Sequence, residues 1–294
     1  RISAPWATRA ALAGDFNGWS PTSTPMNHLG EGLFEVTTPL LEGGDYTTIR
    51  VLYKFVLNGD VWAADPENPL SAWGDSVIEV LPKHPSYPSS RGRLWPEGSV
   101  YSRALGQSIP YLAYLPPGYG DRPGRRYPVI YFLHGYNDGG ARSWLIKGNM
   151  VETLDILIGR GAIPPVIAIF PEAGGSFYAD GPHGQSPWER ALTQELVNHV
   201  DAAFHTRASR RGRAVSGVSM GGFGAVKLAL QYPHLFCSAH AHAGLFDVRD
   251  VDFMPQRFGE GDGSRLHREW NSPIALVEAP ERTEDLQLSF DCGE

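Results

Sequence analysis

The segment Gly217-Val218-Ser219-Met220-Gly221 constrains this chain more than any other. It follows a strand-like run, "GRAVSGV", and precedes a helix-like run, "GGFGAVKLAL". A strand, a sharp turn and a helix in this order form the setting in which a G-x-S-x-G serine is exposed. Ser219 would lie at the positive end of a helix dipole, where a developing negative charge is stabilised. The alternative is a glycine-rich turn with an inert serine, because 34 of the 294 residues are glycine.

Strands and helices alternate around this turn. Strand-like runs occupy residues 109–116, 127–134, 165–171, 212–218, 237–244 and 286–291, and helical stretches occupy 150–161, 188–206 and 221–233. This alternation predicts an α/β fold, with a mostly parallel sheet between helices. In the second helix, Leu192, Leu196 and Val200 recur at four-residue steps and Ala203 follows, so one apolar stripe should face the sheet.

Residues 1–81 have a different pattern. Short runs such as "GLFEVTTPL" and "SVIEVLP" are separated by Asn-Gly, Gly-Gly and Asp-Pro turns, without a helical period. We expect a small all-β sandwich here. Residues 82–98 are rich in Pro, Ser and Arg and are expected to form a linker, so that the α/β domain occupies residues 99–294.

Charge and composition exclude several function classes. The net charge is -7 without an offsetting basic cluster, which argues against a nucleic-acid partner. No apolar run approaches the length of a bilayer span, so we expect no membrane partner. Cys237 and Cys292 lie in strand-like runs and are expected to be buried free thiols, and we expect no metal and no cofactor. The start "RISAPW" has no Met and suggests processing, and the compartment stays open between secreted and cytoplasmic.

A second motif precedes the serine turn. The strand at residues 127–134 ends in His134-Gly135. A strand with this ending offers a backbone donor to an oxyanion, here the Tyr136 N–H, in addition to the Met220 N–H. His134 itself is expected to be a structural, hydrogen-bonding histidine.

A base for Ser219 is harder to place. A serine hydroxyl is a poor nucleophile without a base, and in this arrangement the acid and then the histidine follow the serine. His240 and His242 lie two residues apart, so they should share one strand face as core or strand-end residues. His267 alone has acids between itself and Ser219, which keeps His267 as an alternative base; these acids include Asp247, Asp250 and Asp262.

Several segments resemble one enzyme group in sequence and order. They are "YLPPGYGDRPGRRYPVIYFLHG", "PVIAIFPEAGGSFYADG", "GVSMGGFGAVKLALQYPHLF" and "LQLSFDCG". Over residues 99–294 the chain is similar to the esterase D-like esterases, which include feruloyl esterases, enterochelin esterases, S-formylglutathione hydrolase and mycolyltransferases. The resemblance implies an α/β-hydrolase fold and Ser-Asp-His acyl chemistry. It implies Ser219 as the nucleophile, with Tyr136 and Met220 as oxyanion donors.

The same resemblance bears on the acid and the base. The family's acid lies a few residues after the strand that ends in a "DCG"-like sequence, and its histidine comes later. Asp291 is still within that strand, and Glu294 ends the chain near the acid position. We therefore expect both partners beyond Glu294, and we expect this polypeptide alone to be nearly inactive.

Three aromatic residues are candidates for the substrate side. Trp144, Tyr178 and Trp188 lie in loops or loop ends after sheet strands. Ligands bind at the carboxyl ends of strands in open α/β sheets, and aromatic walls suit a flat acyl group such as a hydroxycinnamate. Ordinary packing is the alternative for each.

The N-terminal segment has a resemblance of its own. Over residues 7–81, "LAGDFNGWSPTSTPM" and "YKFVLNGDVWAADPENP" resemble the early-set, immunoglobulin-like modules of starch- and glycogen-active enzymes. In sugar-binding members two Trp and a Lys form a stacking platform, and the matching residues here are Trp19, Lys54 and Trp62. An insertion, "DYTTIRVL", precedes "YKF", and Asp75 replaces a sugar-contacting Asn. Glucan or xylan binding and a purely structural or substrate-gating role both stay open.

These features favour a serine carboxylesterase acting on a bulky acyl ester, with feruloyl or acetyl esters on polysaccharide as the first expectation. An enterochelin-type siderophore esterase is the second. A non-catalytic carbohydrate-binding protein with a disabled hydrolase domain is the alternative from a different class.

Overall fold

The computed structural model describes residues 1–38, 49–68, 71–72, 74–80, 91–249, 254–278 and 283–292. The chain divides into two compact units, residues 1–87 with 146–156 and residues 88–145 with 157–294. The inserted residues 45–48 and the first nine residues of the expected linker, 82–90, lie outside the described ranges. The domain boundaries at 81 and 99 stay a prediction.

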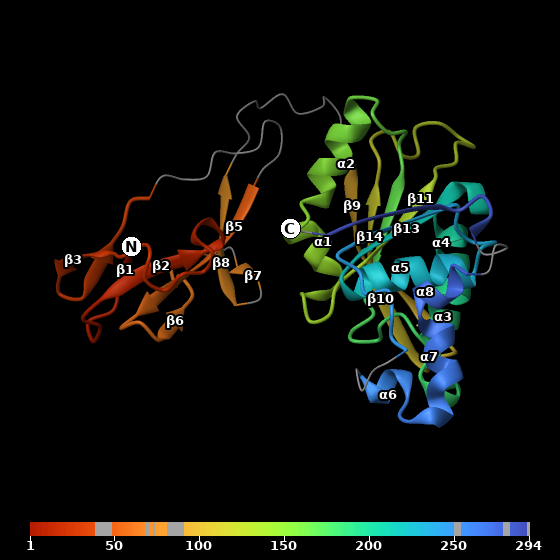
Figure 1. Cartoon of the computed structure of the whole chain (residues 1–294). Helices are drawn as coiled ribbons and strands as arrows, with labels where there is room; N and C mark the ends of the chain where they lie inside the picture. The colour runs from red at the N-terminus through yellow and green to blue at the C-terminus, as the bar shows by residue number, and fades with distance from the viewer. Residues whose placement is uncertain are drawn as a thin grey trace. The chain divides into compact units, whose positions relative to one another are not determined.

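The described strands of the first unit form two antiparallel sheets (Figure 1). One contains β1 (Ile2–Ser3), β4 (Leu33–Glu35) and β3 (Asn27–Gly30); the other contains β2 (Ala10–Gly14), β5 (Ile49–Leu57), β8 (Asp75–Val80) and β7 (Ser71–Ala72), with β6 (Val61–Ala63) also paired to β5. A turn of 3-10 helix follows β2 at Asp15–Asn17. Alternate residues of β5, Tyr53, Phe55 and Leu57, are buried in a core with Phe34, as the period of two in a strand requires. The expected all-β sandwich is confirmed.

A seven-stranded sheet organises the second unit, in the order β15-β14-β13-β11-β12-β10-β9. The strands are β9 (Arg93–Ser102), β10 (Gln107–Leu115), β11 (Val129–Leu133), β12 (Ile167–Pro171), β13 (Arg213–Val218), β14 (Ser238–His242) and β15 (Gln287–Asp291). The last five are parallel, whereas β9 and β10 are antiparallel to their neighbours. The predicted mostly parallel sheet is confirmed. Residues 93–98, expected to be linker, form the first part of β9.

The α-helices are α1 (Ser143–Ile146), α2 (Met150–Gly159), α3 (Trp188–Arg190), α4 (Val197–Ala203), α5 (Met220–Gln231), α6 (Pro255–Phe258), α7 (Arg265–Asn271) and α8 (Pro273–Leu276). A π-helical turn, Ala191–Leu196, joins α3 to α4. Short 3-10 turns lie at Gly140–Arg142, Pro182–Gly184, Arg210–Gly212 and Asp262–Ser264. No helix in the described ranges is long and apolar enough to cross a membrane.

The predicted helix at residues 188–206 carries its apolar stripe as expected. Leu192, Leu196 and Val200 are buried in the core beneath the sheet. Ala203 is exposed, because the helix ends there, and Phe204 is buried instead. The stripe therefore holds this helix against the same sheet face that α5 covers.

The cysteine prediction is only half right. Cys237 is half-buried just before β14 and its thiol contacts the Arg213 carbonyl oxygen at 3.3 Å. Cys292 is exposed, because it follows the last residue of β15, where the strand no longer shields a side chain.

Candidate active site

Ser219 lies on a strained turn between β13 and α5. Its backbone has φ 54° and ψ -114°, a positive φ that non-glycine residues rarely adopt and that costs about 1–3 kcal/mol. A Cβ atom added to Gly217 would lie 2.0 Å from the Gly221 carbonyl oxygen, and one added to Gly221 would lie 2.0 Å from the Leu133 carbonyl oxygen. Both glycines of the motif are therefore required by close backbone approach.

The surrounding main chain holds this turn. The Ser219 N–H donates to the His242 carbonyl oxygen at 2.8 Å, and the Phe223 N–H donates to the Ser219 carbonyl oxygen at 3.0 Å. Met220 is the first residue of the buried α5, where N–H groups have no acceptor within the helix. The turn thus presents Ser219 beside an available backbone donor.

The loop after β11 offers a second donor. Gly135 donates its N–H to Asp138 Oδ2 at 2.8 Å, so that the chain turns sharply before Tyr136. Within the described ranges, the Tyr136 N–H donates to no other protein group. The predicted oxyanion donors Tyr136 and Met220 therefore both follow strands that are adjacent in the sheet, β11 and β13.

His134 fixes this loop. It is 2% exposed, its Nδ1 donates to the Gly135 carbonyl oxygen at 2.8 Å, and its Nε2 lies 3.3 Å from Glu172 Oε1. Glu172 in turn accepts the N–H groups of Ala141 and Gly174, at 3.0 and 3.1 Å. These contacts tie the loops after β11 and β12 together, a structural role like the one expected for His134.

The charges in this cluster stabilise one another. Burial opposes the charged imidazolium, but hydrogen bonds with Asp138 and Glu172 outweigh it and raise the pKa of His134 to about 9. The hydrogen bond with His134 is the main cause that lowers the pKa of Glu172 to about 2. The two carboxylates favour the charged ring, whereas the Ala173 N–H donates to His134 Nε2 at 3.0 Å, a hydrogen bond that only the neutral ring can accept.

Tyr178 and Trp144 do not form the substrate walls expected from the sequence. Tyr178 is 0% exposed, its ring packs on Gly224 of α5, and its hydroxyl donates to the His134 carbonyl oxygen at 2.9 Å. Trp144 is 7% exposed and its ring centroid lies 5.1 Å from that of Phe132. Both rings are therefore buried in this structure, and neither offers the open surface that the predicted substrate role needs.

Two other aromatic residues offer accessible surface. Trp188 is half-buried and packs partly against the core, so its substrate role stays a prediction. Tyr136 is 45% exposed, and its ring lies against Gly175 and 5.8 Å from the Phe177 ring. The sequence prediction used only the backbone N–H of Tyr136. Its place directly after the end of a sheet strand, where ligands bind, was a signal that its ring could contact a substrate as well.

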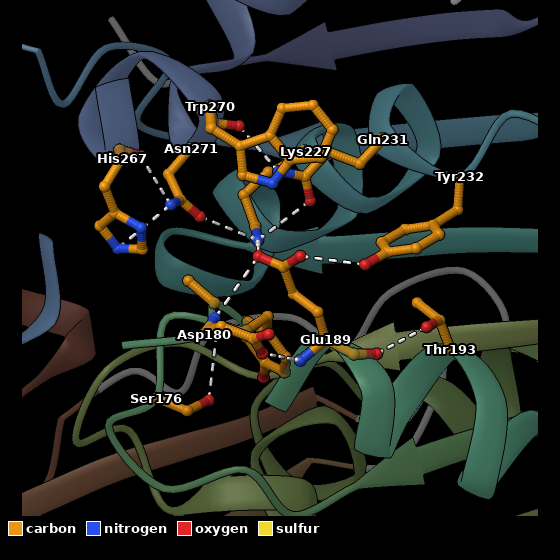
Figure 2. Close-up of polar contacts among 12 residues, drawn as sticks. Ser176, Asp180, Glu189, Thr193, Lys227, Gln231, Tyr232, His267, Trp270 and Asn271 are labelled. Atoms are coloured by element: carbon orange, nitrogen blue, oxygen red, sulfur yellow. Dashed lines mark hydrogen bonds and ion pairs between the residues drawn. The ribbon is translucent and has the colours of Figure 1, made fainter. Parts of the chain in front are cut away.

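A buried polar network fixes α5 (Figure 2). The Lys227 ammonium is fully buried and contacts Glu189 Oε1 at 2.5 Å, Gln231 Oε1 at 3.2 Å and Asn271 Oδ1 at 3.2 Å. Glu189 also accepts the Tyr232 hydroxyl at 3.0 Å. Residues from α3, α5 and α7 are joined at this one ammonium, and α5 carries Ser219 at its start.

His267 belongs to the periphery of this network. Its Nε2 lies 3.3 Å from the Arg257 carbonyl oxygen and 3.4 Å from Asn271 Nδ2. In the described ranges its ring makes no hydrogen bond with Ser219 or with a carboxylate. The arrangement that would make His267 a base for Ser219 is not formed here.

The first unit brings the predicted sugar-platform residues together. The Trp19 and Trp62 ring centroids are 6.4 Å apart with a 34° tilt, and Trp62 is 42% exposed. Lys54 forms an ion pair with Asp75 at 2.9 Å. Lys54 and Val56 point to one face of β5, and Trp62 is paired with Val56 across the ladder. The Lys and both Trp therefore share one face of this sheet.

Comparisons with known proteins place both units. The sequence model described as "Putative esterase" matches residues 102–294, and carbohydrate-binding module 48, the isoamylase N-terminal domain, matches residues 1–67. An esterase of Mycobacterium tuberculosis is 34% identical over 161 residues, which cover 53% of this chain and 33% of that protein. An endo-1,4-beta-xylanase/feruloyl esterase of Xylanibacter ruminicola is 32% identical over 144 residues, covering 47% of this chain and 20% of that protein. The matched region spans a third or less of these relatives.

Solved structures agree on the fold. A ferulic acid esterase superimposes with a TM-score of 0.59 and 24% identity, over 70% of this chain and 81% of that chain. The enterobactin esterase of Shigella flexneri superimposes with a TM-score of 0.57 and 16% identity, over 98% of this chain and 83% of that chain. The family match covers well over half of the 294 residues, so the chain belongs to this esterase family, with an α/β-hydrolase fold and an immunoglobulin-like N-terminal module.

Proposed function

We propose that this member of the esterase family is a serine carboxylesterase that forms an acyl-enzyme on Ser219. The observation that carries the proposal is the Ser219 backbone, held at φ 54° between Gly217 and Gly221, where any side chain would collide with main chain. Strain of this kind persists only where the surrounding structure imposes it, and it is concentrated at active sites. The available N–H groups of Tyr136 and Met220 suit the oxyanion that forms when a hydroxyl attacks an ester.

The reaction would proceed in two steps. Ser219 Oγ forms a bond to the carbonyl carbon, its proton passes to a base, and the alcohol leaves after accepting a proton; water then hydrolyses the acyl-enzyme.

The test is ester turnover by the full gene product. We expect hydrolysis of p-nitrophenyl acetate that Ser219→Ala abolishes and that Ser108→Ala, at an exposed serine of β10, leaves unchanged. Full turnover in Ser219→Ala would overturn the proposal. Ser219-dependent turnover that His267→Ala abolishes would favour His267 as the base.

For the substrate we propose a feruloyl or acetyl ester on a polysaccharide. One support is a relative whose name joins xylanase and feruloyl esterase activities, and a second is the match to a carbohydrate-binding module. A third is the exposed ring of Tyr136, which follows β11, the strand next to β13 that leads into Ser219. Release of ferulate from arabinoxylan is the expected result. The second candidate is a siderophore esterase, because the superposition on an enterobactin esterase covers 98% of this chain. Efficient hydrolysis of a catecholate trilactone without ferulate release would favour this second candidate.

We propose further that the N-terminal module binds a glucan or xylan chain through Trp19 and Trp62. Tilted aromatic rings stack on the apolar faces of sugars, and Lys54 with Asp75 adds polar groups on the same sheet face. Trp62→Ala should abolish retention on an insoluble glucan or xylan. Trp6→Ala is the control, because Trp6 is 58% exposed in the same unit. Sugar binding in a full gene product that hydrolyses no ester would favour the non-catalytic alternative.

A further inference from the structure

Two neighbouring strands place nitrogen and oxygen ligands side by side. His240 and His242 of β14 pair in register with Ser289 and Asp291 of β15. Residues two apart on a strand share a face, so both histidines point to one side, as the sequence predicted, and so do their partners on β15. The sequence alone did not indicate that Asp291 would lie opposite His242.

The three ligand atoms form a compact triangle. His242 Nδ1 lies 3.1 Å from Asp291 Oδ2, His240 Nε2 lies 3.4 Å from the same Oδ2, and the two ring nitrogens are 3.3 Å apart. A four-coordinate zinc ion with bonds of about 2.0–2.1 Å separates its ligands by about 3.3 Å, the edge of the corresponding tetrahedron. The three donor atoms of His240, His242 and Asp291 thus already have about the separation that three ligands of a tetrahedral zinc ion have from one another.

A fourth side chain orients the first histidine. His240 Nδ1 contacts Ser289 Oγ at 2.7 Å, which directs Nε2 toward His242 and Asp291. Metal-binding histidines characteristically use their second nitrogen for such a hydrogen bond, which fixes the tautomer and the ring orientation. The centroid of the Trp144 ring lies 6.1 Å from that of the His242 ring.

The main chain keeps both strand ends in place. The Ala243 N–H donates to the Asp291 carbonyl oxygen at 2.7 Å, directly after the paired strands end. The side chains of His240, His242 and Asp291 are 30%, 41% and 59% exposed, so an ion has access from solvent. The three donor atoms lie within the 4.8 Å span compatible with one ion.

We propose that His240, His242 and Asp291 form a site for a divalent transition-metal ion, Zn²⁺ in the first place. Two imidazoles and one carboxylate suit zinc and its first-row neighbours, whereas Mg²⁺ and Ca²⁺ prefer oxygen ligands alone. Three protein ligands leave a fourth position for water. The bound ion would join β14 to β15. It would also lie close to the Ser219 turn, because one of its ligands, His242, accepts the Ser219 N–H through its main-chain carbonyl oxygen.

Binding is tested with the metal alone, by calorimetric titration of the 294-residue chain with ZnCl₂. We expect one equivalent to bind, and His240→Ala, His242→Ala or Asp291→Asn to weaken binding about 100-fold or more, and Ser289→Ala about tenfold. His234→Ala is the matched control, since His234 is exposed and precedes β14. Cys292→Ser must also retain binding, because its exposed thiol could capture zinc by itself.

Two further measurements separate binding from folding. Zn²⁺ should raise the Tm of the wild-type chain and of His234→Ala, but not that of His240→Ala. Co²⁺ should give the visible absorption of a four-coordinate ion in the wild-type chain and in His234→Ala, but not in His240→Ala. The proposal is overturned if zinc binds His240→Ala as tightly as the wild type, or if Cys292→Ser alone abolishes binding. It is equally overturned if Mg²⁺ competes on equal terms with Zn²⁺.

Discussion

The Lys227 ammonium and the Glu189 carboxylate form a buried ion pair of 2.5 Å between helices α5 and α3. Their exposed fractions are 0% and 5%. Burial lowers the pKa of Lys227, whereas the ammonium outweighs the effect of burial on Glu189 and lowers the pKa of that carboxyl. Because α5 begins directly after Ser219, this pair fixes the helix that positions Ser219.

Removing one partner of this pair should be strongly destabilising. Lys227→Met leaves the Glu189 carboxylate buried without compensation, and we expect the free energy of unfolding to fall by about 3–5 kcal/mol. The double variant Lys227→Met/Glu189→Met should recover most of this loss, because it leaves no uncompensated charge. Urea unfolding of both variants measures the difference, and equal stability of the single and double variants would contradict it.

The elbow glycines should not tolerate a methyl group. Gly221→Ala places a Cβ atom 2.0 Å from the Leu133 carbonyl oxygen, so β11 and α5 must separate. We expect about 1–3 kcal/mol of destabilisation and loss of Ser219-dependent ester turnover in the full gene product. Gly263→Ala is the control, because its added Cβ has no neighbour within 4 Å. A Gly221→Ala variant with wild-type turnover would contradict the close approach.

The His134–Glu172 pair should give stability a defined pH window. The pKa of Glu172 falls from 4.5 to about 2 on folding, so its contribution is present above pH 4.5 and is lost as the pH falls toward 2. The pKa of His134 rises from 6.5 to about 9, so its contribution is present below pH 6.5 and is lost as the pH rises through 9. The Tm difference between wild type and Glu172→Gln should therefore be largest between pH 4.5 and 6.5.

The matched control for this pH profile is Glu260→Gln, at an exposed position in the same unit. Its Tm difference from the wild type should stay small and flat from pH 4 to 10. A Glu172→Gln difference that grows above pH 9 would show that His134 is not the partner that titrates.

The features that sequence predicted are those that depend on local pattern. The sharp turn at Ser219 follows from the glycines around it, and the helical stripe follows from the spacing of Leu192 and Leu196. The shared face of His240 and His242 follows from the period of two in a strand. Each prediction needs only neighbours within one element.

The features that sequence missed depend on which distant elements meet. Lys227 and Glu189 are 38 residues apart and His242 and Asp291 are 49 apart, so only the packing of α3 on α5 and the order of β14 and β15 join them. The burial of Tyr178 has the same origin, because Gly224 of α5 opens the space that the ring fills. Helices α6, α7 and α8 have at most seven residues each, too few for a periodic pattern to show.

Tyr136 and Tyr178 should separate substrate contact from support. Tyr136→Ala removes the exposed ring, and we expect KM for methyl ferulate to rise about two- to tenfold, the equivalent of one aromatic contact, while KM for p-nitrophenyl acetate changes little. Tyr178→Phe removes only the hydrogen bond to the His134 carbonyl oxygen, which should cost about 1 kcal/mol of stability and leave the ratio of the two KM values unchanged. Steady-state kinetics of the full gene product measure both ratios. If Tyr178→Phe changed the ratio and Tyr136→Ala did not, the assignment of the exposed ring to the acyl side would be wrong.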